Sequence, residues 1–287
     1  MPDSASIALY LDRLGVDHAP PSAEALFEIH RAHVERVPYE TTWIQMQERW
    51  SVDQEASFER IARARRGGYC FHLNGALAML LGSLGYDVTL HRGGVHDANG
   101  PAGTTMDNHL VLIVHGLETD GNPAGEWYVD AGLGDGLHEP LPLRSGTFAQ
   151  GPFTFELHES EAAEADWQFR HDPTGSFFGM AFRAGPAKIE EFAERNVVLS
   201  TSPDSGFVKL VTVQRRDAGG VDIMRGLVLR RVGSAPEADR TVNSADEWFT
   251  VLGERLGLPL ADVSSPDRRL LWERVHASHQ VWLAQQP

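Results

Sequence analysis

The 287-residue chain has a single cysteine and no long apolar run. One cysteine, Cys70, excludes an intrachain disulfide and any zinc site built from several thiolates, and it fits a reducing compartment. No stretch approaches the ~18 uninterrupted apolar residues of a membrane-spanning helix. The segment Met1–Ile7 lacks the basic and apolar stretches of a secretion signal. We therefore expect a cytoplasmic protein without a membrane partner.

Basic residues are also in short supply. Lys and Arg number 25 against 40 Asp and Glu, which gives a formal net charge of -15. Such a surface repels a phosphate backbone or an anionic lipid surface, so nucleic acid is not an expected partner. Because 42% of the residues are hydrophobic, the chain can bury a substantial core, and its length predicts two or three closely packed subdomains.

The spacings of common metal and nucleotide sites are absent as well. The chain contains 13 histidines. Pairs such as His30 and His33 nevertheless stand without a His-Glu-x-x-His motif or a cysteine cluster, so no metal is predicted. Gly132–Gly136 has the wrong spacing for a dinucleotide-binding loop, and no Walker-type phosphate loop is present. We expect no tightly bound cofactor.

The hydrophobic pattern changes along the chain. Up to Leu84, apolar residues recur at three- and four-residue spacing, which predicts helices. Ser22 is a candidate N-cap of the second helix, which Val37-Pro38 should end. Beyond residue 86, short β-branched and aromatic runs predict antiparallel strands. These runs are 88–91, 109–114, 127–130, 153–157, 167–170, 207–215 and 226–232.

The remaining segments complete the predicted organisation. Residues 93–105 are rich in Gly and are predicted to form a flexible loop, whereas 246–256 and 266–284 return to helical spacing. We predict an α+β protein in three parts. They are a helical bundle carrying the nucleophile (1–86), a β-barrel carrying a histidine and an aspartate (87–200), and an α/β lid (201–287).

Cys70 is placed for chemistry. It follows Arg65-Arg66-Gly67-Gly68 and directly precedes a helical stripe of leucines, so it should lie at a helix start. Unpaired backbone N–H groups and the positive end of the helix dipole favour the thiolate there. A lone cysteine is more often a small buried hydrophobe. Two arginines immediately before it argue against that interpretation.

A thiolate nucleophile usually needs a histidine that is oriented by a third group. His109 opens one predicted strand and Asp130 closes the next, with a Gly- and Asn-rich turn between them. If the two strands form a hairpin in which Val114 faces Gly125, His109 faces Asp130 at its open end. Each residue alone would more often be structural. Together with Cys70 they predict a catalytic triad.

The segment Arg66-Gly67-Gly68-Tyr69-Cys70-Phe71-His72-Leu73-Asn74 resembles the fingerprint Arg-Gly-Gly-x-Cys-x-Glu-Leu-Asn of the arylamine N-acetyltransferase family. Other parts of the chain resemble the family in the same order. They are residues 37–40, 109–112, 128–134, 140–143 and 196–207. The resemblance implies an N-terminal helix bundle, a central β-barrel, a C-terminal α/β lid and a papain-like triad of Cys70, His109 and Asp130.

The resemblance also implies ligands. Acetyl-CoA, or another acyl-CoA, would be the co-substrate and would bind in the cleft between barrel and lid, where Thr105 and Asn108 match positions that contact CoA. An aromatic amine would be the acceptor. The acceptor pocket would be shaped or supported by Tyr39, Glu40, Arg66, Phe71 and His72.

Three departures from the family pattern bear on the acceptor. His72 replaces a glutamate, Tyr39 replaces a phenylalanine, and Thr41-Thr42 replace Asn-Leu. A side chain two residues along a helix points about 200° away, so His72 is expected to support the site rather than react. Glu40 and Arg66 resemble the family's structural ion pair beside the nucleophile.

The predicted reaction is ping-pong transfer of an acetyl or short acyl group to an arylamine or hydrazine nitrogen through an acyl-cysteine. Two alternatives keep the triad. One is an amide synthase that releases an acyl chain from a carrier protein, and the other is a cysteine hydrolase of thioesters or amides. A third alternative is a binding protein without catalysis, which the three matching residues disfavour.

Overall fold

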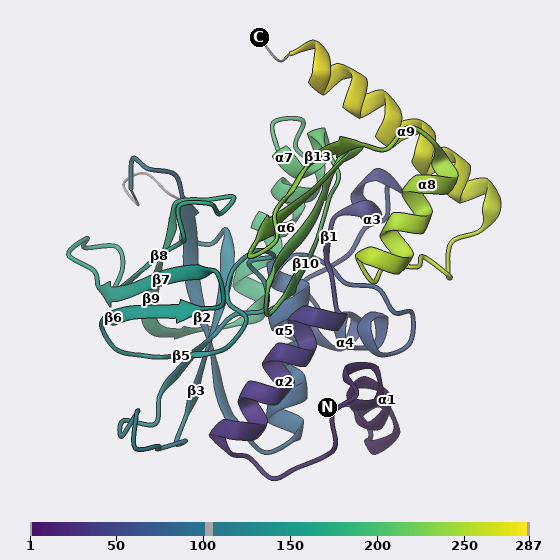
Figure 1. Ribbon diagram of the computed structural model, residues 1–287. Helices are drawn as coiled ribbons and strands as arrows, with labels where there is room; N and C mark the ends of the chain where they lie inside the picture. Colours follow the sequence, from purple (N-terminus) through teal and green to yellow (C-terminus); the bar gives the residue numbers. More distant parts are fainter. Residues whose placement is uncertain (1, 101–105, 286–287) are drawn as a thin grey trace.

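The computed structural model describes residues 2–100 and 106–285. Helices gather at the N-terminal end of the chain, and two antiparallel sheets follow (Figure 1). This is the predicted α+β class. Within the described residues, no helix is both long and apolar enough to cross a membrane.

The N-terminal part is helical, as predicted. Ser22 caps the second helix by accepting a hydrogen bond from the Ala25 N–H at 3.1 Å, and Val37 ends it. One short strand, β1, interrupts the helices. The elements are α1 (Ser4–Leu14), α2 (Ala23–Arg36), β1 (Tyr39–Glu40), α3 (Thr42–Gln45), α4 (Gln54–Ala62) and α5 (Cys70–Ser83).

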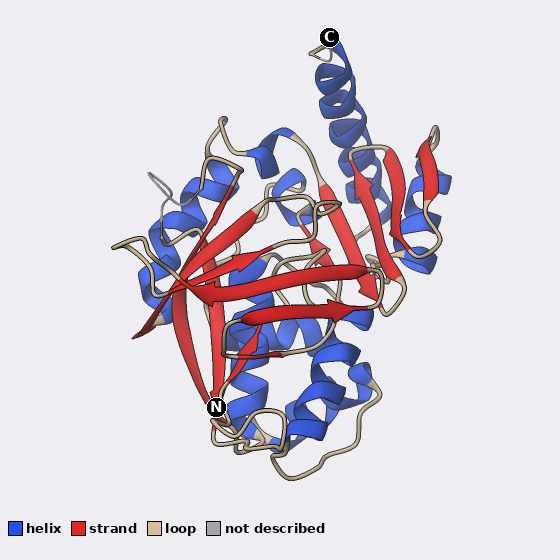
Figure 2. Cartoon of the chain, turned by 60° about the vertical axis from the view of Figure 1, so that its left-hand side comes forward, coloured by secondary structure: helices blue, strands red, loops and turns tan. Residues whose placement is uncertain are grey.

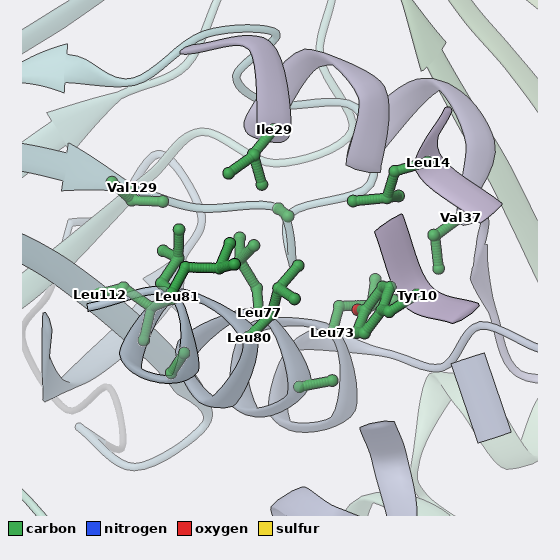
Figure 3. Close-up of a cluster of buried hydrophobic side chains, with 14 of the residues drawn as sticks. Tyr10, Leu14, Ile29, Val37, Leu73, Leu77, Leu80, Leu81, Leu112 and Val129 are labelled. Atoms are coloured by element: carbon green, nitrogen blue, oxygen red, sulfur yellow. The ribbon is translucent and has the colours of Figure 1, made fainter. Parts of the chain in front are cut away.

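Helix α5 is the centre of this part. It is buried on nearly all sides, as expected of an apolar helix inside a core. Leu73, Leu77, Leu80 and Leu81 pack against side chains from α1 and α2 and from the strand residues Leu112 and Val129 (Figure 3). The helix that begins at Cys70 is therefore held between the bundle and the first sheet.

The first sheet has eight antiparallel strands and curls into a barrel-like shape (Figure 2). Its order is β5-β4-β3-β2-β9-β8-β7-β6. The strands are β2 (Asp87–His96), β3 (His109–His115), β4 (Trp127–Val129), β5 (Leu141–Pro142), β6 (Gly146–Gln150), β7 (Phe153–Glu159), β8 (Trp167–Arg170) and β9 (Gly179–Ala187). The prediction of a loop from residue 93 is wrong for Gly93–His96, because β2 pairs there with β9.

The second sheet has five antiparallel strands in the order β1-β10-β11-β12-β13. Besides β1, these strands are β10 (Thr212–Asp217), β11 (Gly220–Arg225), β12 (Val228–Gly233) and β13 (Glu237–Thr241). The helices of this part are the 3-10 turn Ile189–Phe192, α6 (Ala193–Thr201), α7 (Gly206–Lys209), α8 (Ala245–Thr250), a π-helical turn Val251–Arg255 and α9 (Ser265–Ala284). One face of the sheet packs against α8 and α9.

Two details differ from the predicted organisation. Phe207–Lys209 was expected in a strand but forms α7, because the Ser205 hydroxyl accepts from the Phe207 N–H and caps a helical turn. The strand β1 lies in the helical segment of the sequence but pairs with β10. The proposed boundary at residue 200 falls within α6.

Substituting Leu77 with alanine should destabilise the fold. Leu77 is 1% exposed, so Leu77→Ala should lower the free energy of unfolding by about 2–5 kcal/mol. Leu270→Ala, on the exposed side of α9, should change it by less than about 0.5 kcal/mol. Denaturant unfolding of both variants measures the difference, and equal effects would contradict the placement of α5 in the core.

Candidate active site

Cys70 is the first residue of α5 and follows a closely packed pair of glycines. Gly68 has φ +149°, and a Cβ there would lie 2.6 Å from the Cβ of His72. A Cβ on Gly67 would lie 1.8 Å from the carbonyl oxygen of Pro38. Only glycine fits at these positions. Cys70 therefore occupies a helix end where N–H groups lack intrahelical partners and the helix dipole is positive.

His109 and Asp130 are in contact, and both are buried. Nε2 of His109 lies 2.7 Å from Oδ2 of Asp130. The Tyr128 hydroxyl donates to the same oxygen at 2.9 Å. The other oxygen accepts from Nδ2 of Asn74 at 2.8 Å and from the Gly132 N–H at 2.9 Å. The carboxylate thus fills all of its acceptor positions, which holds it in one orientation.

The register of the β3–β4 hairpin differs from the prediction. Leu112 pairs with Val129, two residues beyond its predicted partner Trp127, and β4 ends before Asp130. Side chains alternate between faces with a period of two, so a shift of two residues keeps His109 and Asp130 on the same side. The pair is diagonal rather than directly opposed, and the length of the imidazole side chain bridges the difference.

The sulfur of Cys70 lies beside this pair. Its Sγ is 3.8 Å from the carbonyl oxygen of Asn108, the residue before His109. Burial would lower the pKa of His109, but the charges of Asp130 and Cys70 and hydrogen bonds to both outweigh it and raise the pKa to about 10. Because Nε2 of His109 contacts Asp130, Nδ1 is the ring nitrogen left to interact with Cys70. A pKa of about 10 keeps the imidazole protonated at neutral pH.

Sequence reasoning did not single out Asn74 as a site residue. It stands four residues after Cys70, so both side chains lie on one face of α5. Besides binding Asp130, its Nδ2 donates to the Leu110 carbonyl at 2.6 Å, and its Oδ1 accepts from the Ala131 N–H at 2.9 Å. Asn74 therefore fastens α5 to the ends of β3 and β4. The four-residue spacing from Cys70 is the signal that could have identified it.

Gly132 was also not recognised as a site residue. A Cβ on this residue would lie 2.7 Å from the Cα of Cys70. Glycine is therefore required where the segment after Asp130 passes the start of α5. No pattern within the sequence shows that these two backbones meet.

Cys70 and His109 open onto a cleft of about 730 Å³. The first sheet and its loops contribute residues such as Val95, Leu133 and Phe177, and the second sheet faces them. Within residues 2–100 and 106–285, no group of three or more His, Cys, Asp or Glu side chains could hold a metal ion. The cleft is thus large enough to bring a sizeable ligand to Cys70 and His109.

Comparison with known proteins identifies the family of the chain. A family model described as N-acetyltransferase matches residues 22–264. The pineal gland arylamine N-acetyltransferase NAT-3 of Gallus gallus is 29% identical over 238 residues, which cover 76% of this chain and 79% of that protein. Human arylamine N-acetyltransferase 1 is 28% identical over 243 residues, which cover 78% and 82%. The chain belongs to the arylamine N-acetyltransferase family.

Solved structures show the same fold. The Salmonella typhimurium arylamine N-acetyltransferase superposes with a TM-score of 0.83 at 23% identity, covering 96% of this chain and 100% of that chain. The Mycobacterium marinum arylamine N-acetyltransferase in complex with CoA gives 0.82 at 22% identity, covering 95% and 99%. As a member of this family, the protein is an acyltransferase.

In this member of the family, Glu40 and Arg66 form a fully buried ion pair. The guanidinium lies 3.1 Å from Oε1 of Glu40 and 3.2 Å from Asp262. The second carboxylate oxygen of Glu40 accepts from the Thr42 N–H at 2.8 Å. Removing either partner would leave the other charge buried and unpaired, which is strongly destabilising. The pair therefore holds β1 next to the segment that leads to Cys70.

His72 and Phe71 are buried behind the nucleophile and do not line the cleft. The His72 ring packs edge-on against Trp43 and Tyr69, at centroid distances of 5.4 and 4.8 Å. Burial, with nearby Arg60, lowers the pKa of His72 to about 3, so the ring is neutral. The residue that replaces the family glutamate thus fills an aromatic cluster.

Two of the predicted ligand-binding residues line the cleft. Tyr39 lies next to Cys70 there, as a member of β1. Asn108 lines the cleft too, but its side chain is held by the backbone of Val95, with Oδ1 accepting at 2.8 Å and Nδ2 donating at 3.2 Å. Asn108 therefore anchors the segment before His109. Thr105 lies outside the described residues.

Removing the charge of Asp130 should make Cys70 less reactive. In Asp130→Asn, the carboxylate that raises the pKa of His109 is lost, so the imidazolium no longer stabilises the thiolate. We expect alkylation of Cys70 by iodoacetamide at pH 7 to slow by about tenfold or more. Asp107→Asn is the control, because Asp107 pairs with Arg195 instead. Equal rates in both variants would contradict this role of Asp130.

Proposed function

We propose that this protein transfers an acetyl group from acetyl-CoA to the nitrogen of an arylamine or hydrazine in a ping-pong reaction, with Cys70 as nucleophile, His109 as acid and base, and Asp130 as orienting carboxylate. The observation that carries the proposal is the Asp130–His109 contact of 2.7 Å beside a cysteine that opens onto a large cleft. Family membership supports the reaction class. The Mycobacterium marinum relative of the same fold binds CoA.

The first half-reaction loads the enzyme. The Cys70 thiolate attacks the thioester carbonyl, the C–S bond to CoA breaks, and the imidazolium of His109 protonates the departing CoA thiolate. Exchange of one thioester for another is nearly isoenergetic, so the step is reversible. The raised pKa of His109 ensures that a proton is available at neutral pH.

The second half-reaction discharges the acyl group. His109, now neutral, takes the proton of the attacking amine while the C–N bond forms and the C–S bond to Cys70 breaks. The products are an amide and the restored thiolate–imidazolium pair. Because an amide is more stable than a thioester, this step drives the cycle. Asp130 keeps the imidazole aligned in both steps.

The acyl-cysteine should be observable directly. Intact mass after mixing with acetyl-CoA should show one added acetyl group that maps to Cys70, and adding aniline or a hydrazine should remove it. Cys70→Ala should show neither the added mass nor turnover. Turnover by Cys70→Ala would contradict the proposal, and steady release of CoA without any amine would indicate a hydrolase.

Tyr39→Phe should change the choice of acceptor without changing the loading step. The variant keeps the ring that lines the cleft and removes only the hydroxyl. An apolar acceptor bound there would leave that hydroxyl without a hydrogen-bond partner. We expect the ratio of kcat/KM for 4-methylaniline over 4-aminophenol to rise about tenfold. The rate of Cys70 acetylation should stay within about twofold, and an unchanged acceptor ratio would show that Tyr39 does not contact the acceptor.

A further inference from the structure

Two histidines on neighbouring strands of the first sheet contact the same hydroxyl group. Nε2 of His91, on β2, and Nε2 of His115, at the end of β3, each lie 2.7 Å from Oγ1 of Thr89. His91 is buried, and the side chain of His115 is 28% exposed. None of these three residues lines the cleft. His109 and His115 are the two ends of β3, about 20 Å apart along the strand, so the cluster is separate from the active site.

The other nitrogen of each ring faces a hydrogen-bond acceptor. Nδ1 of His91 lies 3.2 Å from the carbonyl oxygen of Gly185, and Nδ1 of His115 lies 3.2 Å from Oε1 of Glu126. Because a carbonyl and a carboxylate only accept, both Nδ1 atoms must carry a hydrogen. In a neutral imidazole the remaining nitrogen is then an acceptor. Both Nε2 atoms therefore present a lone pair to Thr89.

The hydroxyl of Thr89 cannot satisfy both rings. It has one hydrogen to donate, whereas three acceptors surround it, namely the two Nε2 atoms and the carbonyl oxygen of Ile113 at 3.4 Å. Thr89 thus leaves at least one of the two Nε2 lone pairs without a donor. A cation held between the two nitrogens would satisfy both lone pairs at once.

The geometry suits a divalent metal ion that prefers imidazole, such as Zn²⁺. The two Nε2 atoms are no more than about 5.4 Å apart, which is twice their distance from Oγ1. In a tetrahedral zinc site, two nitrogens that are each about 2.0–2.1 Å from the metal lie about 3.3–3.4 Å apart. A shift of about 1 Å by each ring would therefore bring both onto one ion. The Thr89 hydroxyl would turn to the Ile113 carbonyl, and water would complete the coordination.

The partners of the two rings are typical of metal-binding histidines. Such histidines usually donate Nδ1–H to a carbonyl or a carboxylate, which fixes the ring with Nε2 towards the metal. His91 and His115 have one partner of each kind. Asp87 lies directly across from His115 in the pairing of β2 with β3. The charges of Asp87 and Glu126 favour a cation at this end of the sheet.

We propose that His91 and His115 bind a divalent metal ion of the zinc class, with Gly185 and Glu126 orienting the two rings. The ion would link β2 to β3 at the end of the first sheet that lies away from His109. Because the two histidines stand at positions 91 and 115, no short spacing motif marks them, and the sequence predicted no metal. The inference does not depend on the proposed function, since no step of the reaction uses these residues.

Zinc titration measures the site. Calorimetry at pH 7 compares the unaltered protein with Cys70→Ala, in which the active-site thiolate no longer competes for the metal. Cys70→Ala should bind one equivalent of Zn²⁺ at micromolar concentration. Adding His115→Gln should weaken that binding by about tenfold or more. His158→Gln, an exposed histidine on β7, is the matched control and should leave the affinity unchanged. Equal affinities in the two histidine variants would overturn the proposal.

Glu126→Gln tests the orienting partner. A neutral amide holds the Nδ1–H of His115 less strongly than a carboxylate, so the affinity for Zn²⁺ should fall about tenfold. Asp87→Asn is its control, because it removes a charge directly across from His115, and exposed charges are screened. It should weaken binding by less than about threefold. Equal losses in both variants would contradict the orienting role of Glu126.

Imidazole ¹⁵N spectra of the unaltered protein test the tautomers without any substitution in the cluster. Before zinc is added, both rings should carry a hydrogen on Nδ1 and none on Nε2, and Zn²⁺ should shift the Nε2 signals of both. If His115 carries two hydrogens at pH 7 and no Zn²⁺ binds, a proton completes the cluster and the proposal is wrong. Shifts confined to His115 would also overturn it, because the metal would then be held by one exposed ring.

Discussion

The carboxylate of Asp130 is the constraint on which the active site depends. It accepts hydrogen bonds from α5, from the first residue of β3, from β4 and from the turn that follows β4. A buried carboxylate with all its acceptor positions filled cannot rotate without losing several charge-assisted bonds. This one group therefore sets the orientation of His109 and fastens α5, the helix that begins at Cys70, to the sheet.

The short strand β1 connects the segment before Cys70 to the second sheet. The Glu40 N–H donates to the carbonyl of Gly68 at 2.9 Å, so the turn into Cys70 is bonded directly to a strand of that sheet. The buried Glu40–Arg66 pair reinforces this junction. Because Tyr39 directly precedes Glu40 and lines the cleft with Cys70, the side of the cleft formed by β1 is part of the same unit.

Much of the fold follows from local patterns. The apolar spacing of α5, the Ser22 cap and the strand Trp167–Arg170 all depend on neighbours in sequence, and the structure has them as predicted. Features that depend on distant partners were predicted less well. The strand character of Gly93–His96 comes from pairing with β9, about 85 residues further along the chain.

For the site, the sequence alone determined which groups could react. A cysteine after two glycines at a helix start, a histidine opening a strand and an aspartate at the end of the next are recognisable from their local positions. Only the tertiary structure decided how they meet, because hairpin register, the approach of Gly132 to Cys70 and the two extra bonds of Asn74 arise between segments far apart in the chain. Contacts of that kind depend on packing, which no spacing within a single segment encodes.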